Sequence, residues 1–243
     1  MLFRSDVIDD PTLTTYEGHT LMGNYYVDTE SVRPKPVQLI EKGALKSFLR
    51  TRQPMKGFTE STGHARLAGS FGHKTATIGN LFIKSRETKP WAELKTQFLD
   101  MLKQRSKPYG ILVRKIDYPS SGSVGDLQAL FASHQQSGST TRPLAPLVLV
   151  YKVYVADGRE ELIRNVRLKN VSARTLRDIL GASSEVAKFD FVNNNAPFAL
   201  MGWAGYLAPA TIVAPGVLFE EMEIERIQDQ TVKPPVTAAP ALR

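Results

Sequence analysis

The chain has 243 residues, of which 42% are hydrophobic and 23% charged, and its formal net charge is +7 at pH 7. This composition is typical of a globular protein, and no apolar run approaches the ~20 residues of a membrane-spanning helix. The absence of cysteine excludes disulfides, thiolate metal ligands and a cysteine nucleophile within these residues. The start MLFRSDVIDD lacks the apolar stretch of a signal peptide, so we expect a cytoplasmic protein without a membrane partner.

The positive charge raises the hypothesis of a nucleic-acid partner. The 31 Lys and Arg residues are spread along the chain and lie near acidic residues, as in REELIRNVRLKN. A nucleic-acid interface normally shows a clustered basic patch or an aromatic binding motif. Neither is present in the sequence, so we do not expect nucleic acid to be the main partner.

The first third of the chain has the composition of β-strands. Segment 21–28 (LMGNYYVD) is rich in aromatic residues between turn formers and predicts a strand. Segment 37–49 predicts a hairpin, because two apolar runs flank Gly43, which can adopt the positive φ of a tight turn. Segment 75–85 predicts another strand, with a bulge or local break at Gly79-Asn80.

Up to three helices follow. Segment 89–105 is the clearest, since its apolar residues recur at helical spacing and should face the core. Segment 126–134 predicts a short helix inside a Ser/Gly-rich stretch. Segment 172–182 predicts another, with Ser172 and Gly181 as caps. The core-facing residues of the first helix are Trp91, Leu94, Phe98, Met101 and Leu102.

The rest of the chain again predicts strands, which cover 109–118, a hairpin at 146–169, 188–192 and 210–227. Asp157-Gly158 favours a type I′ turn in the hairpin, and Pro215-Gly216 should interrupt the last strand. Residues 229–243 are expected to form a disordered tail. The fold class is therefore α+β, a predominantly antiparallel sheet or barrel-like domain over residues 1–228 with two or three helices.

Two adjacent carboxylates, Asp9 and Asp10, precede Pro11 and could form either an acid/base pair or a turn. Successive side chains of a strand point to opposite faces, so the two carboxylates would not easily share a ligand. Asp before Pro-Thr is common in turns, where the carboxylate accepts backbone N–H bonds. We therefore interpret the three residues as a structural turn.

In order along the chain, several segments resemble the C-terminal domain of the TldD/PmbA family, once called modulators of DNA gyrase and now regarded as zinc metallopeptidases. The resemblance extends over roughly residues 5 to 227. The segments that carry it are VIDDPTL (7–13), VDTESV (27–32), LIEKGALKSFLRTR (39–52), STGHAR (61–66), IGNLFI (78–83), DGRE (157–160) and PATIVAPGVLFEEMEI (209–224).

The resemblance implies a β-rich, barrel-like C-terminal domain of a two-domain peptidase. In the family, the zinc is held by two histidines of an HExxxH helix and by a late cysteine, and a metal-bearing chain often pairs with a related chain that lacks the metal. The sequence of this chain has no HExxxH and no cysteine. In the family that helix and the N-terminal domain come before the segment that matches VIDDPTL, so we expect both to be missing from this chain.

These departures lead to a specific expectation. The chain should be the C-terminal domain of a TldD/PmbA-type metallopeptidase for peptide maturation or proteolysis, inactive alone, with no catalytic or metal-ligating residue of its own. Zinc is expected only in the complete family enzyme, and the partner should be a second copy or a related chain. The alternative is a non-catalytic partner or scaffold subunit. His64 and Arg66 are the candidates for a cleft or substrate contact, with a surface loop as the alternative.

Overall fold

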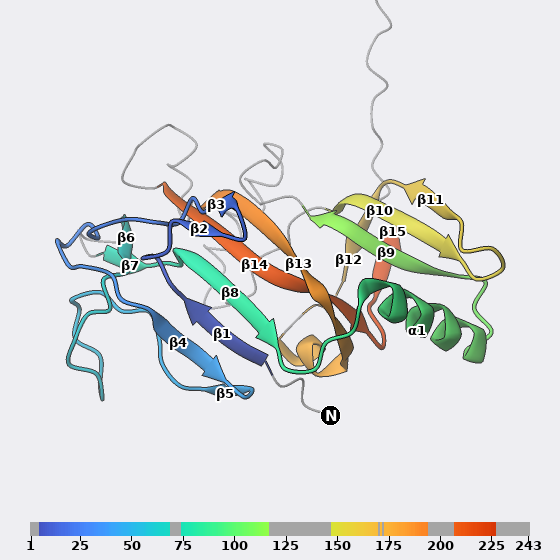
Figure 1. Ribbon diagram of the computed structural model, residues 1–243, viewed down its shortest axis with the longest axis horizontal. Helices are drawn as coiled ribbons and strands as arrows, with labels where there is room; N and C mark the ends of the chain where they lie inside the picture. The colour runs from blue at the N-terminus through green and yellow to red at the C-terminus, as the bar shows by residue number, and fades with distance from the viewer. Residues whose placement is uncertain are drawn as a thin grey trace, which may run out of the picture.

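The computed structural model describes residues 5–68, 74–116, 147–169, 171, 173–193 and 207–226. Its centre is a six-stranded sheet (Figure 1). Neighbouring strands are antiparallel except for β14 and β8, which run parallel. The strands in order across the sheet are β13 (Ile179–Asn193), β14 (Ala208–Phe219), β8 (Asn80–Ser85), β1 (Ser5–Asp9), β4 (Val37–Glu41) and β5 (Ala44–Leu45).

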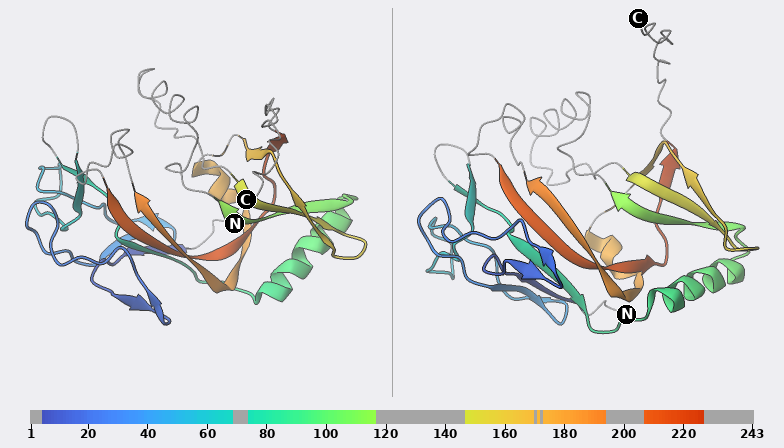
Figure 2. Two further views of the ribbon diagram at one scale, coloured as in Figure 1. Left: turned by 90° about the horizontal axis from the view of Figure 1, so that it is seen from above. Right: turned by 45° about the horizontal axis from the view of Figure 1, so that its top comes forward.

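Smaller sheets surround the central one. At the end of the molecule away from β4 and β5 lies a three-stranded sheet (Figure 2), in the order β11 (Glu160–Ile163), β10 (Leu147–Tyr154) and β9 (Tyr109–Ile116). The remaining strands form three two-stranded ribbons: β12 (Val166–Leu168) with β15 (Ile224–Arg226), β2 (Thr15–Tyr16) with β3 (His19–Thr20), and β6 (Ala65–Ala68) with β7 (Lys74–Ala76).

Helix α1 (Trp91–Gln104) packs against both sheets through its apolar stripe, in which Leu94 and Leu102 are buried. Two glycines, one in each sheet, let the helix lie close to the strands. A Cβ on Gly110 of β9 would lie 2.2 Å from the Phe98 ring, and one on Gly181 of β13 would lie 3.0 Å from Leu94. The apolar residues whose spacing predicted this helix thus form the face that packs against both sheets.

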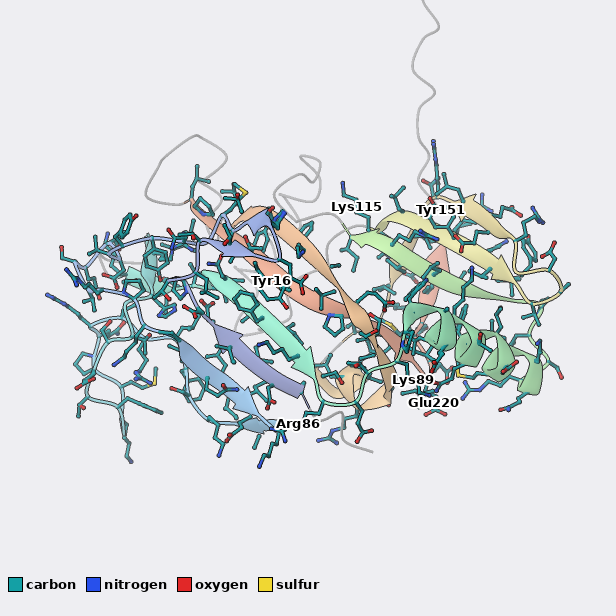
Figure 3. The ribbon with its side chains drawn as sticks, viewed as in Figure 1. Tyr16, Arg86, Lys89, Lys115, Tyr151 and Glu220 are labelled. Atoms are coloured by element: carbon teal, nitrogen blue, oxygen red, sulfur yellow. The ribbon has the colours of Figure 1, made fainter. Side chains whose placement is uncertain are left out.

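The main sheet carries a small apolar core on the face that the β2–β3 ribbon covers. Leu21, Phe82 and Val213 are buried there, and Tyr16 packs against them with its ring centroid 5.3 Å from that of Phe82. Figure 3 shows Tyr16 beside β8. The segment after β3 is therefore fixed on the sheet by apolar burial.

The prediction of two or three helices is not confirmed among the described residues. Segment 172–182 forms a short 3₁₀ helix, η3 (Ala173–Asp178), and then enters strand β13 at Ile179. Segment 126–134 lies outside the described residues, so α1 is the one α-helix in the part of the chain described here. The pairing of the 15-residue strand β13 with β14 overrides the local helix signal, because helix propensity is weaker than tertiary pairing.

Other local predictions also differ from the structure. Segment 21–28 is irregular rather than a strand, and the loop at 155–159 is longer than the type I′ turn expected at Asp157-Gly158. Pro215-Gly216 lies inside β14 without ending it, because the irregularity falls on β13 instead, between Ala182 and Val186.

The expected barrel is not closed. Among the described strands, β13 and β5 end the main sheet on either side. The predicted tail at 229–243 lies outside the described residues. No helix in the described part of the chain is long and apolar enough to cross a membrane.

Candidate functional site

The candidate site is built around the end of β1, where Asp9 is completely buried. Its two carboxylate oxygens accept hydrogen bonds from the backbone N–H of Gly79, at 2.9 and 3.1 Å. Gly79 lies in the break between β7 and β8, so this N–H has no partner in a strand ladder at this point. The carboxylate satisfies a buried donor that the break in the strand creates.

His64 lies against this carboxylate and is also fully buried. Its Nδ1 lies 2.9 Å from the carbonyl oxygen of Thr62. A carbonyl oxygen only accepts, so this geometry assigns a proton to Nδ1. Its Nε2 lies 3.5 Å from Asp9 Oδ1 and has no hydrogen-bond partner among the described residues. Nε2 therefore faces the Asp9 carboxylate without a hydrogen bond, and both side chains are shut off from solvent.

Gly63 makes the approach of His64 possible. Its φ is +72°, and a Cβ at this position would lie 2.5 Å from the backbone oxygen of Arg33. Only glycine tolerates both the positive φ and this close backbone contact. The Gly in STGHAR therefore turns the chain so that His64 enters the interior.

Tyr25 and Arg66 form the next layer. The Tyr25 ring meets His64 edge-on with centroids 6.5 Å apart, and its hydroxyl donates to the Gly63 carbonyl at 2.8 Å. Arg66 stacks on the Tyr25 ring, with its guanidinium carbon 4.4 Å from the centroid. Burial raises the pKa of the Tyr25 hydroxyl, and the negative charge of Asp9 adds to this. Burial lowers the pKa of Arg66.

Asp28 fastens the loop that follows Tyr25. Its Oδ1 accepts from the backbone N–H groups of Glu30 and Val32, both at 2.9 Å, and its Oδ2 accepts from Ala65 N–H at 3.0 Å. The carboxylate therefore joins its own turn to β6, next to His64. In the sequence, Asp28 was visible only as part of the family-like element VDTESV, and its anchoring role depends on a contact 37 residues away.

Asp10 and Pro11 occupy a turn directly after β1. Asp10 Oδ1 accepts from the backbone N–H of Thr12 at 3.0 Å, while the buried Pro11 offers its carbonyl to the Asn24 side chain at 2.9 Å. Asp9 and Asp10 point to different partners, so the two adjacent carboxylates do not form a joint site. The structure brings together Asp9, His64 and Arg66 and leaves Asp10 outside.

A second polar network lies on the face of β13 and β14 under the β2–β3 ribbon. His19 Nε2 lies 2.7 Å from Asp190 Oδ2, and Thr211 donates its hydroxyl to the other oxygen of Asp190 at 2.6 Å. The Thr211 hydroxyl in turn accepts from Met22 N–H at 2.8 Å. Sequence reasoning missed this group, since its members are up to 192 positions apart along the chain. Its contacts fasten the ribbon to the sheet.

A polar groove of about 600 Å³ runs along α1 and the start of β13. Figure 3 shows Lys89 where the chain enters this region from β8. Among the described residues, its walls carry one lysine, one arginine, two acids and two glutamines, and no buried titratable groups meet there as Asp9 and His64 do. The groove is lined by Lys89, Glu93, Thr96, Gln97, Asp100, Met101, Gln104, Arg105 and Leu180.

Hydrolytic zinc needs about three protein ligands and an open position for water. The described residues contain no group of three or more His, Asp or Glu side chains able to hold a metal ion. Both oxygens of Asp9 are already bound to Gly79 N–H, and His64 presents Nδ1 to a carbonyl. The Asp9–His64 pair does not fit a zinc ion.

Comparison with known protein families shows which family the chain belongs to. The model of the PmbA/TldA metallopeptidase C-terminal domain matches residues 4–133, more than half of the chain and all the residues of the Asp9–His64 site. The chain belongs to the PmbA/TldD family. No curated protein matches its sequence.

Solved structures of PmbA/TldD proteins share the fold. TldE from Thermococcus kodakarensis is 15% identical, with a TM-score of 0.52. TM0727 from Thermotoga maritima, a candidate modulator of a DNA gyrase, is 17% identical, with a TM-score of 0.50. In each case the match covers 91% of this chain and 39% of the other, so the chain spans about two fifths of these proteins.

Proposed function

We propose that this chain is the C-terminal domain of a PmbA/TldD-type metallopeptidase that acts in peptide maturation or proteolysis and that it does not hydrolyse peptides by itself. The observation that carries the proposal is the family match over residues 4–133. The sequence contains neither the HExxxH motif nor the cysteine that the family resemblance implies. The catalytic zinc and its ligands would therefore come from residues outside these 243.

This domain would support the peptide-binding site and help to recognise the peptide. The buried residues Asp9, Asp28 and His64 hold three loop segments at one end of the main sheet, as the distances above describe. Such a rigid support is what a peptide site needs if its zinc centre lies on a neighbouring element. We propose a second copy or a related chain as the partner, a peptide as the substrate and the cytoplasm as the location.

A non-catalytic partner or scaffold subunit is the second candidate. The absence of cysteine in all 243 residues favours it, because one of the three zinc ligands implied by the family would be absent from this part of any longer chain. In this case the domain would shape a peptide-binding surface beside a metal-bearing relative.

Native mass spectrometry of the protein tagged after Arg243 and isolated from its own cells tests both candidates. A longer chain or a second subunit that carries zinc supports the peptidase domain. A metal-free assembly of 27.0 kDa chains contradicts it and leaves the scaffold. Peptidase assays on the purified 243-residue chain complete the test, since cleavage of unfolded peptides that a chelator abolishes would refute the proposed inactivity.

A further inference from the structure

Arg66 is held in one orientation on the surface side of the candidate site. It extends from β6, and its guanidinium lies flat against the Tyr25 ring and donates to the Ile78 carbonyl at 2.8 Å. Tyr25 is itself fixed by its hydrogen bond to Gly63 and its edge contact with His64. The position of the guanidinium is therefore set by a buried support rather than by the flexible arginine stem.

Within the described part of the chain, the charge of Arg66 has no direct counter-ion. No carboxylate of the described residues lies within ion-pair distance of its guanidinium, although Asp9 acts on it at longer range. A guanidinium has five N–H donors, and the described residues accept from Arg66 only at Ile78. Taking a charge partly out of water without a counter-ion is costly, and the donors that no described residue accepts could serve a ligand.

The other ring-stacked arginines do not share this property. Arg114 stacks on Tyr151, labelled in Figure 3, and Arg159 stacks on Tyr154, but both also pair with carboxylates. Arg50 stacks on Phe58 and donates to the Glu60 carbonyl, the Ser47 hydroxyl and, at longer range, the Phe48 carbonyl. Arg66 thus combines a stacked, half-buried guanidinium with donors that none of the described residues uses.

We infer that Arg66 is the receptor for a carboxylate of a bound peptide, with Tyr25 as its platform. A planar guanidinium binds a carboxylate through two parallel N–H···O bonds, a geometry that lysine cannot reproduce. The inference rests on the proposed peptide function and names the group that this domain would recognise. The carboxylate can come from the C-terminus of the peptide or from an Asp or Glu side chain.

Fluorescence anisotropy with labelled, unstructured peptides tests the inference on the full 243-residue chain. One peptide ends in a free carboxylate, its twin in an amide, and a second amidated pair differs by one internal Glu or Gln. For the wild type, we expect a carboxylate peptide to bind at least tenfold more tightly than its neutral twin. The pair that shows this difference identifies the source of the carboxylate.

Three variants assign the effect to Arg66. Arg66→Gln should abolish the preference, and Arg66→Lys, which keeps the charge, should lose most of it. Arg50→Gln, the stacked control, should leave the preference unchanged. Equal binding of charged and neutral twins to the wild type, no binding of any peptide, or an unchanged preference in Arg66→Lys would overturn the inference. The readout is binding without cleavage, so it is independent of whether a zinc-bearing partner exists.

Discussion

Removal of the Asp9 carboxylate is the sharpest perturbation of the candidate site. In Asp9→Ala, the Gly79 N–H, which the carboxylate accepts at 2.9 Å, becomes a buried donor without a partner. An unsatisfied buried polar group costs about 1–3 kcal/mol. His64 Nε2, 3.5 Å from Asp9 Oδ1, also loses this neighbouring carboxylate. We expect the free energy of unfolding to fall by about 2 kcal/mol, from the unsatisfied N–H alone.

Urea denaturation followed by circular dichroism measures this loss, and the next residue provides the control. Asp10→Ala removes the hydrogen bonds that the Thr12 N–H and hydroxyl donate to Asp10 Oδ1 at the surface. Water can replace this acceptor there, so a loss of about 0.5–1.5 kcal/mol is expected. The two variants make the same chemical change at adjacent positions, so they differ mainly in burial. A loss under about 1 kcal/mol for Asp9→Ala, or one no larger than that for Asp10→Ala, would refute the assigned role of the buried carboxylate.

Two further variants probe the packing and the charges around the site. Gly23→Ala should prevent stable folding, because its Cβ would lie 2.1 Å from the Gly79 carbonyl oxygen. Gly18→Ala, at an open position with φ +74°, should lower the free energy of unfolding by only about 1 kcal/mol. Equal expression levels and melting temperatures of the two variants would contradict this. A hydrogen bond from Lys95 to Glu160, supported by Arg114, holds the pKa of that carboxyl below its ordinary value. A carboxyl whose pKa is lower in the folded state stabilises the fold above its unfolded-state pKa, and this stabilisation is lost as the pH falls. Glu160→Gln should therefore lower the free energy of unfolding by under about 1 kcal/mol at pH 7, and by progressively less below about pH 4. A cost that grows in acid would show that the sign is wrong.

The elements with strong local patterns could be predicted from the sequence. The apolar spacing of segment 89–105 predicted α1, and Gly43, with φ +79°, occupies the tight turn between β4 and β5. The break predicted at Gly79-Asn80 lies at residues 77–79, between β7 and β8, and Asn80 already begins β8. The same local logic failed at 172–182, where the caps of a helix were present but β13 begins at Ile179, because pairing with a distant strand outweighs a short helical propensity.

At the candidate site, what the sequence determines and what the tertiary structure decides can be separated more clearly. The sequence by itself determined the family motifs VIDDPTL and STGHAR, the absence of HExxxH and cysteine, and the candidate residues Asp9, Asp10, His64 and Arg66. Only the tertiary structure decided that Asp9 turns inward to Gly79 and His64 while Asp10 caps a surface turn. It also placed Tyr25 under Arg66. The contacts of Asp9 with Gly79 and His64, and of Tyr25 with Arg66, join residues 41 to 70 positions apart. Burial sets the free-energy cost of each buried charge, and burial is a property of the packed fold and not of the local sequence.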